Sequence, residues 1–194
     1  MISYIYLTLC FVLPCFAWQL FNKKKIKTTN HATRHIVWTV IFWLYCALAL
    51  HEAGIGTLWD IIYYKEIMGG INLTPLSLNP RLTQLLNIFM FIPLGFLLPL
   101  IWERFRSFYR VIFTGYGFSL LIEILQLFNH RISDIDDLIM NTVGTCIGYL
   151  IWVVFKFVFY RKRKTATEFS KREPIIYLLL GVMGIFFLFN WRLL

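Results

Sequence analysis

Residues 122–141 read IEILQLFNHRISDIDDLIMN, a polar stretch that separates two long apolar runs. Four of the ten acidic residues of the chain fall within it. Apolar runs of about 20 residues are long enough to cross a hydrocarbon layer about 30 Å thick as helices. The stretch therefore predicts a short turn between two membrane-spanning helices, with acids gathered near one membrane surface.

The composition of the whole chain supports a membrane protein. Its 194 residues are 59% hydrophobic and 15% charged, and their mean hydropathy is +0.67. Soluble domains carry about 25% charged residues. A chain of this length has too little polar cover to bury so many apolar segments in water. We therefore expect an all-α polytopic membrane bundle of about six transmembrane helices.

Hydropathy and the intervening loops divide the chain further. The predicted spans lie at about 2–21, 36–53, 85–102, 111–128, 138–159 and 175–193. The first half of segment 57–86 mixes aromatic and charged residues, which is typical of a helix lying at the membrane surface, here the outer one. The predicted organisation is a two-helix segment 1–56, a core 57–160 and a basic loop with the last helix, 161–194.

Basic residues are concentrated in alternate loops. The net charge is +9, and fourteen of the nineteen Lys and Arg residues lie in loops 22–35, 103–110 and 160–174. The positive-inside rule places these loops in the cytoplasm and both termini outside. This distribution argues against nucleic acid as a partner and favours contact with membrane lipids.

Glu123 is an acidic residue inside the fourth predicted span, close to its outer end. An ionised carboxylate at the centre of a bilayer costs up to about 2.5–3.5 kcal/mol, and less near the edge. It should therefore face the protein interior or a wet cavity. Gln126 follows on the same helical face, and Arg131 is the nearest basic residue in the sequence.

The fifth predicted span begins with a second polar face. Asp134, Asp137, Asn141, Gly144 and Gly148 follow at spacings of three and four, which places them on one side of a helix. Ser133 or Asp134 is the expected N-cap. Asp136 falls off this face, and we expect it to be solvated. Acids in a first turn also stabilise the helix dipole, so a structural role competes with a functional one.

Two polar faces joined by a short loop should meet near the outer membrane surface. The candidate pocket residues are Glu123, Gln126, Arg131, Asp134, Asp137 and Asn141. A hard divalent cation prefers such carboxylates, and its ligands would be Glu123, Asp134 and Asp137. A ligand pocket without metal and purely structural polar packing are the other two readings. His51 and Glu52, near the outer end of the second span, are expected to be interfacial polar residues.

Four segments carry a resemblance to a known family: INLTPL (71–76), NIFMFIPLGFLLPL (87–100), IEILQLF (122–128) and RISDIDDLIMNTVGTCIGY (131–149). They resemble the VanZ-like membrane proteins, which are associated with resistance to glycopeptide antibiotics, teicoplanin in particular. The resemblance implies a bacterial cell membrane and adds Asn72 and Asn87 to the candidate pocket. It supplies no catalytic residues and no cofactor.

Three functions compete on this evidence. The first is a non-enzymatic membrane protein that lowers susceptibility to glycopeptides, whose pocket binds the antibiotic, a lipid or a lipid-linked wall precursor. The second is an enzyme acting on a lipid-linked envelope precursor, with a carboxylate as general base. The third is a small lipid or solute transporter with a polar groove. We favour the first.

Overall fold

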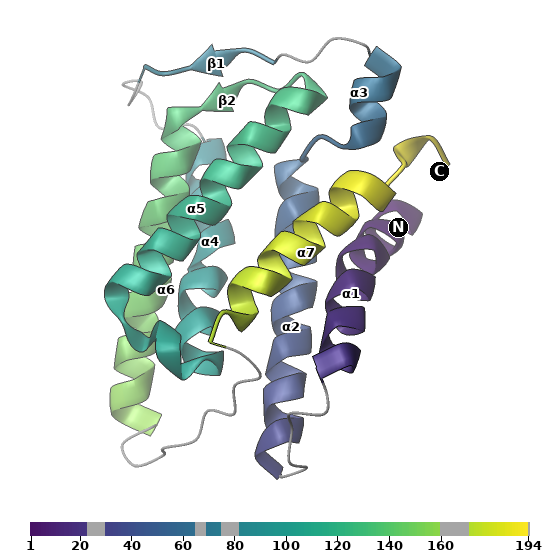
Figure 1. The fold of residues 1–194 in the computed structure, drawn as a ribbon. Helices are drawn as coiled ribbons and strands as arrows, with labels where there is room; N and C mark the ends of the chain where they lie inside the picture. Colours follow the sequence, from purple (N-terminus) through teal and green to yellow (C-terminus); the bar gives the residue numbers. More distant parts are fainter. Residues whose placement is uncertain (23–29, 65–68, 75–81, 160–170, 194) are drawn as a thin grey trace.

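The computed structural model describes residues 1–22, 30–64, 69–74, 82–159 and 171–193. It is a bundle of long helices with very little sheet, which confirms the predicted all-α architecture (Figure 1). The long helices are α1 (Ile2–Asn22), α2 (Asn30–Ala53), α4 (Leu82–Ile101), α5 (Phe108–Gln126), α6 (Ile135–Phe159) and α7 (Glu173–Leu188). The short elements are α3 (Leu58–Tyr64), β1 (Ile71–Asn72), η2 (Glu103–Arg106), η3 (Leu127–Asn129), β2 (Ser133–Asp134) and η4 (Trp191–Leu193).

Five helical stretches of the described chain are long and apolar enough to cross a membrane. They are Ile2–Asn22, Thr33–Tyr64, Leu82–Ile101, Phe108–Asn129 and Ile135–Phe159. The sixth predicted span is also an apolar helix, but α7 has only 16 residues and ends at Leu188. At 1.5 Å per residue it is about 24 Å long, shorter than a hydrocarbon layer of about 30 Å.

The two ends of the bundle differ (Figure 1). One end carries α3, β1 and β2, and both termini lie toward it; we call it the ladder end. The opposite end, the loop end, carries η2 and the helix ends that flank segments 23–29 and 160–170. The basic residues predicted at 23–27 and 161–164 lie outside the described residues. The helix ends on either side of these two segments lie at the same end of the bundle as η2.

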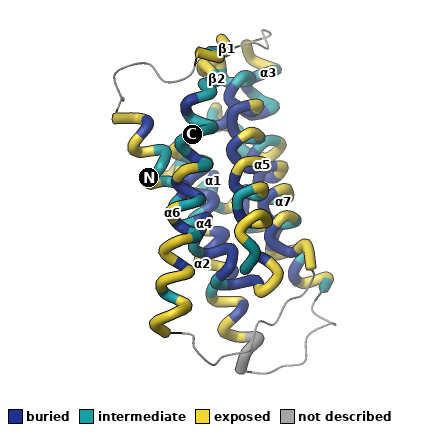
Figure 2. The backbone as a smooth tube through the Cα atoms, turned by 90° about the vertical axis from the view of Figure 1, so that its left-hand side faces the viewer, coloured by how far each residue is buried: buried dark blue, intermediate teal, exposed yellow. Residues whose placement is uncertain are grey.

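Helices α4 and α6 make the closest packing in the bundle. A Cβ atom at Gly144 or Gly148 of α6 would collide with the carbonyl oxygen of Ile88 or Ile92 of α4. Gly95 of α4 meets α6 in the same way. Small residues let membrane helices approach closely enough for backbones to touch. Along the long helices, buried and exposed residues alternate, as expected when one face packs inward and the other faces lipid (Figure 2).

A short parallel ladder at the ladder end was not predicted. β1 pairs with β2 in the register Ile71 to Ser133 and Asn72 to Asp134. The Ser133 amide also donates to the carbonyl oxygen of Gly70 at 2.9 Å. Strands of two residues leave no periodic pattern in a sequence. The ladder ties the segment before α4 to the start of α6.

A buried polar pair joins α2 to α7 on the loop side of the bundle. Glu173, the first residue of α7, is 0% exposed, and its Oε1 lies 2.9 Å from Nε2 of His35 in α2. The Tyr177 hydroxyl donates to the same oxygen at 3.0 Å. Aromatic rings surround the pair: Trp102 packs edge-on to His35, and Trp43 packs edge-on to Tyr177. This cluster holds the short α7 against the bundle.

Candidate functional site

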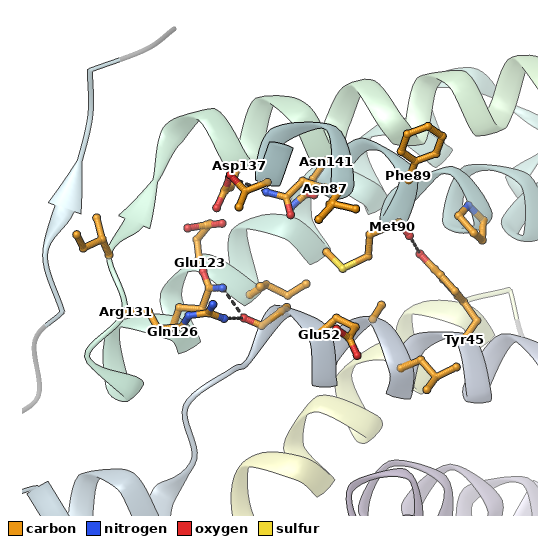
Figure 3. A pocket seen from close by; sticks show the side chains of 18 residues that line it. Tyr45, Glu52, Asn87, Phe89, Met90, Glu123, Gln126, Arg131, Asp137 and Asn141 are labelled. Atoms are coloured by element: carbon orange, nitrogen blue, oxygen red, sulfur yellow. Dashed lines mark hydrogen bonds between the residues drawn. The ribbon is translucent and has the colours of Figure 1, made fainter. Parts of the chain in front are cut away.

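A pocket of about 740 Å³ lies among α2, α4, α5 and the start of α6 (Figure 3). Six of the eight residues predicted for the candidate pocket line it: Asn87, Glu123, Gln126, Arg131, Asp137 and Asn141. The other two, Asn72 and Asp134, do not line it. The structure therefore brings together the two polar faces that the sequence placed on consecutive helices.

Glu123 occupies the last turn of α5 and is 5% exposed. Its Oε2 accepts hydrogen bonds from the Ser133 hydroxyl at 2.8 Å and from the Asp134 backbone amide at 3.1 Å. The carboxylate therefore holds β2 in place just before α6 begins. Such bonds to an ionised acceptor are stronger than those between neutral groups. Figure 3 shows Glu123 and Asp137 pointing toward one another on the left-hand side of the pocket.

Asp137 and Asn141 lie one turn apart on the inner face of α6. The Asn87 amide of α4 donates to Asp137 Oδ1 at 2.6 Å, and the Asn141 amide donates to Ser119 of α5 at 2.9 Å. Asn141 is 2% exposed, and its Oδ1 has no hydrogen-bond partner within the described part of the chain. A buried acceptor without a donor is costly, which makes Asn141 the least satisfied group of the pocket.

Gln126 and Arg131 both bind the C-terminal end of α2. Each donates to the carbonyl oxygen of Ala53, Gln126 at 2.7 Å. The last carbonyls of a helix lack partners inside it, and a nearby cation is favoured there by the helix dipole. Gly54 ends the helix with φ of +64°, a conformation that favours glycine, and a Cβ atom there would collide with the Arg131 side chain. Arg131 is therefore fixed at the edge of the pocket.

Asn72 and Asp134 contact each other outside the pocket. The Asn72 side chain donates to Asp134 Oδ2 at 3.1 Å, alongside their backbone pairing in the ladder. The other Asp134 oxygen accepts from the Asp136 amide at 3.0 Å, which is the expected N-cap of α6. Both residues therefore shape the start of α6. Asn72 and the Asp136 amide occupy the two oxygens of the Asp134 carboxylate.

The prediction that Asp136 is solvated was wrong. Asp136 is 3% exposed, and its Oδ2 accepts a hydrogen bond from the Gln84 side chain at 2.9 Å. Gln84 is itself buried in the first turn of α4. The position of Asp136 on α6 turns it away from the pocket and toward α4, a neighbour that the sequence alone did not place. A buried carboxylate with an amide partner contributes to packing at this helix crossing.

Among the α2 residues that line the pocket, the sequence did not predict the two with polar side chains, Tyr45 and Glu52. The Tyr45 hydroxyl donates to the carbonyl oxygen of Met90 in α4 at 2.7 Å, which joins the two helices at one end of the pocket. Glu52 is exposed at the other end and accepts from the Tyr4 hydroxyl at 3.2 Å. Their spacing of seven residues, two helical turns, places them on one face of α2, but it does not show which helices that face meets.

The carboxylates suggested as metal ligands do not form one cluster. Within the described ranges, no group of three or more His, Cys, Asp or Glu side chains has the arrangement of a metal site. Asp134 bonds to Asn72 and to the Asp136 amide, whereas Glu123 and Asp137 face the pocket. The donor set that the spacing suggested is therefore divided between the ladder and the pocket.

Comparison with known proteins places most of the chain in one family. Residues 4–156 match the family model described as VanZ/LLP1, which covers most of the chain and all of the pocket residues. No curated protein and no solved structure proved similar to the chain.

Proposed function

We propose a function from one premise: the chain belongs to the VanZ/LLP1 family, and it is a multi-pass membrane protein. The proposed function is to lower the susceptibility of a bacterial cell to glycopeptide antibiotics such as teicoplanin, without catalysis. The pocket lined by Glu123, Asp137 and Asn141 is the site that we assign to this function.

The single observation that carries the proposal is that the polar pocket lies toward the end of the bundle opposite the basic loops. The described Lys and Arg residues in or next to the elements of the loop end are Arg34, Arg104, Arg106, Arg110, Lys156, Lys171 and Arg172. Of the described Lys and Arg residues, those at the ladder end are Arg131, just before β2, and Arg192 in η4. With the positive-inside rule, this asymmetry supports a cytoplasmic loop end, extracellular termini and a pocket in the outer half of the membrane. Glycopeptides act on that side of the cell membrane.

The first test measures teicoplanin susceptibility of a susceptible Gram-positive host that expresses the protein. We expect the wild-type chain to raise the minimal inhibitory concentration above that of the empty vector. Glu123→Gln and Asp137→Asn should return it to the vector level, because each removes a pocket charge while keeping the size of the side chain and an oxygen for hydrogen bonding. Membrane levels of every variant are measured in the same cells by immunoblot.

The matched control is Glu103→Gln. Glu103 is an exposed carboxylate of η2, at the loop end, where it pairs with Arg106 at 3.0 Å. This variant should protect as well as wild type, because exposed ion pairs contribute little and the residue lies far from the pocket. The proposal is contradicted if wild type is present in the membrane and gives no protection. It is also contradicted if Asp137→Asn protects fully.

A further inference from the structure

The pocket opens sideways between α2 and α4, through the outer surface of the bundle. Leu48 of α2 and Leu86 and Phe89 of α4 line it, and these side chains are 50%, 56% and 66% exposed. Both helices belong to stretches that are long and apolar enough to span a membrane. Exposed apolar side chains on such helices face lipid chains. An occupant therefore reaches this pocket from within the lipid layer.

The inner wall next to this opening is apolar and suits a hydrocarbon chain. Met90 and Pro93 of α4 and Ile122 of α5 form it. The bond between the Tyr45 hydroxyl and the Met90 carbonyl closes the wall by holding α2 to α4. None of these side chains offers a charged or hydrogen-bonding group to an occupant, apart from the tyrosine hydroxyl that is already used. This part of the pocket can bind an acyl chain by burial of apolar surface.

The other part of the pocket carries charges of both signs. Glu52, Glu123 and Asp137 line it together with Arg131. Among the described residues, no carboxylate lies within ion-pair distance of the Arg131 guanidinium. The acids and the guanidinium therefore do not neutralise one another directly. An occupant with separate positive and negative groups would complement both, and the excess of acids favours the positive group.

The side chain of Asn141 favours a positive group that can donate hydrogen bonds. Its amide nitrogen already donates to Ser119, while its buried oxygen has no donor in the described chain. A hydrogen-bond donor brought by an occupant could satisfy this oxygen as well as the neighbouring carboxylates. A primary ammonium has three N–H donors, whereas a quaternary ammonium has none. The pocket chemistry therefore distinguishes between these two kinds of headgroup.

We propose that this pocket binds an aminophospholipid, a membrane lipid whose headgroup carries a primary ammonium next to its phosphate. The ammonium binds among Glu123, Asp137 and Asn141, and the phosphate lies toward Arg131. One acyl chain leaves through the opening between α2 and α4. The inference deepens the proposed function by naming a ligand class for the same pocket, and it rests on that function only for its biological meaning.

The test is a lipid competition followed by native mass spectrometry of the purified full-length protein. Phosphatidylethanolamine, phosphatidylcholine and phosphatidylglycerol with identical acyl chains are supplied in equal amounts in detergent micelles. We expect phosphatidylethanolamine to be retained about tenfold over each of the others, the ratio expected for one charge-assisted hydrogen bond in the lower part of its usual range. Equal retention of the three lipids, or a preference for either of the others, would overturn the inference.

The variant Asp137→Asn and the double variant Glu123→Gln/Asp137→Asn remove the acidic partners of the ammonium. The preference for phosphatidylethanolamine over phosphatidylcholine should be lost in the double variant and reduced in Asp137→Asn, while Glu103→Gln keeps it. A folded variant that loses both pocket acids and still prefers phosphatidylethanolamine contradicts the inference. The retention of the three lipids by the wild-type protein tests the inference even where a variant does not fold.

The two proposals fail separately. If wild type protects cells from teicoplanin but shows no headgroup preference, the lipid inference fails and the proposed function stands. If wild type selects phosphatidylethanolamine but gives no protection, the proposed function fails and the lipid inference stands.

Discussion

Replacing Gly148 by leucine is expected to destroy the packing of α4 against α6 and with it the folded bundle. A side chain at this position would meet the carbonyl oxygen of Ile92, a backbone atom that cannot turn aside as a flexible side chain can. Overpacking a core costs about 1–3 kcal/mol, occasionally more, and we expect a value at or above the upper limit. Thermal unfolding in detergent, followed by circular dichroism or by aggregation, measures the loss.

Gly117→Leu is the matched control for Gly148→Leu. Gly117 also lies within a membrane-spanning helix, α5, but a Cβ atom there would meet nothing within 4 Å. This variant should be at least as stable as wild type, because leucine also has the higher helix propensity. If the two variants unfold at the same temperature, the close approach of α4 and α6 is not what holds this bundle together.

Glu173→Ala is expected to cost about 2–6 kcal/mol of unfolding free energy, because it leaves two buried polar partners without their acceptor, at about 1–3 kcal/mol each. The carboxylate is fully buried. Its Oε1 accepts a hydrogen bond from the Tyr177 hydroxyl and is also within hydrogen-bond distance of the His35 ring. Its removal leaves both polar groups facing a void in the aromatic cluster. Glu173→Gln should cost less, because the amide oxygen can still accept one of these bonds.

The control for this prediction is an exposed pair on the same protein. Glu103→Ala breaks the contact with Arg106, where the glutamate side chain is 55% exposed, and should cost about 0–1 kcal/mol. Denaturant titrations of the variants, with a double-mutant cycle to His35→Ala, measure both quantities. If Glu173→Ala is no more damaging than Glu103→Ala, then α7 is not anchored through this pair.

The positions of the long helices could be predicted from the sequence, because a membrane span depends on the apolar character of consecutive residues. The span expected at 138–159 is α6, Ile135–Phe159, and the glycines expected on its inner face, Gly144 and Gly148, do lie against α4. The length of α7 could not be predicted in the same way. The predicted span continued to residue 193, but at Phe189 the backbone becomes extended and η4 follows.

The sequence could predict those residues of the candidate site that lie on one helix face, or on two helices joined by a short loop. Glu123, Gln126, Asp137 and Asn141 met these conditions, and all four line the pocket. The contributions that depend on distant segments could not be predicted. The sequence does not show that α2 brings Glu52 to the pocket.

Two further residues illustrate the same limit. Gln84 of α4 reaches Asp136, which is why that carboxylate is buried and not solvated. Asn72 is drawn to Asp134 by a ladder of two residues per strand, too short to leave a pattern in the sequence. In both cases the partner lies about 50 or more residues away, and only the packing of α4 and α6 brings the two together.

The proposed function requires an open pocket, and one substitution tests this requirement without changing any charge. Ala49 of α2 is buried and lines the pocket, so Ala49→Trp fills part of it, whereas Ala17→Trp places the same side chain on the exposed face of α1. The measurement is teicoplanin susceptibility of cells in which wild type protects, at matched protein levels. We predict that Ala49→Trp gives the susceptibility of the empty vector and that Ala17→Trp protects fully; full protection by Ala49→Trp would contradict the account.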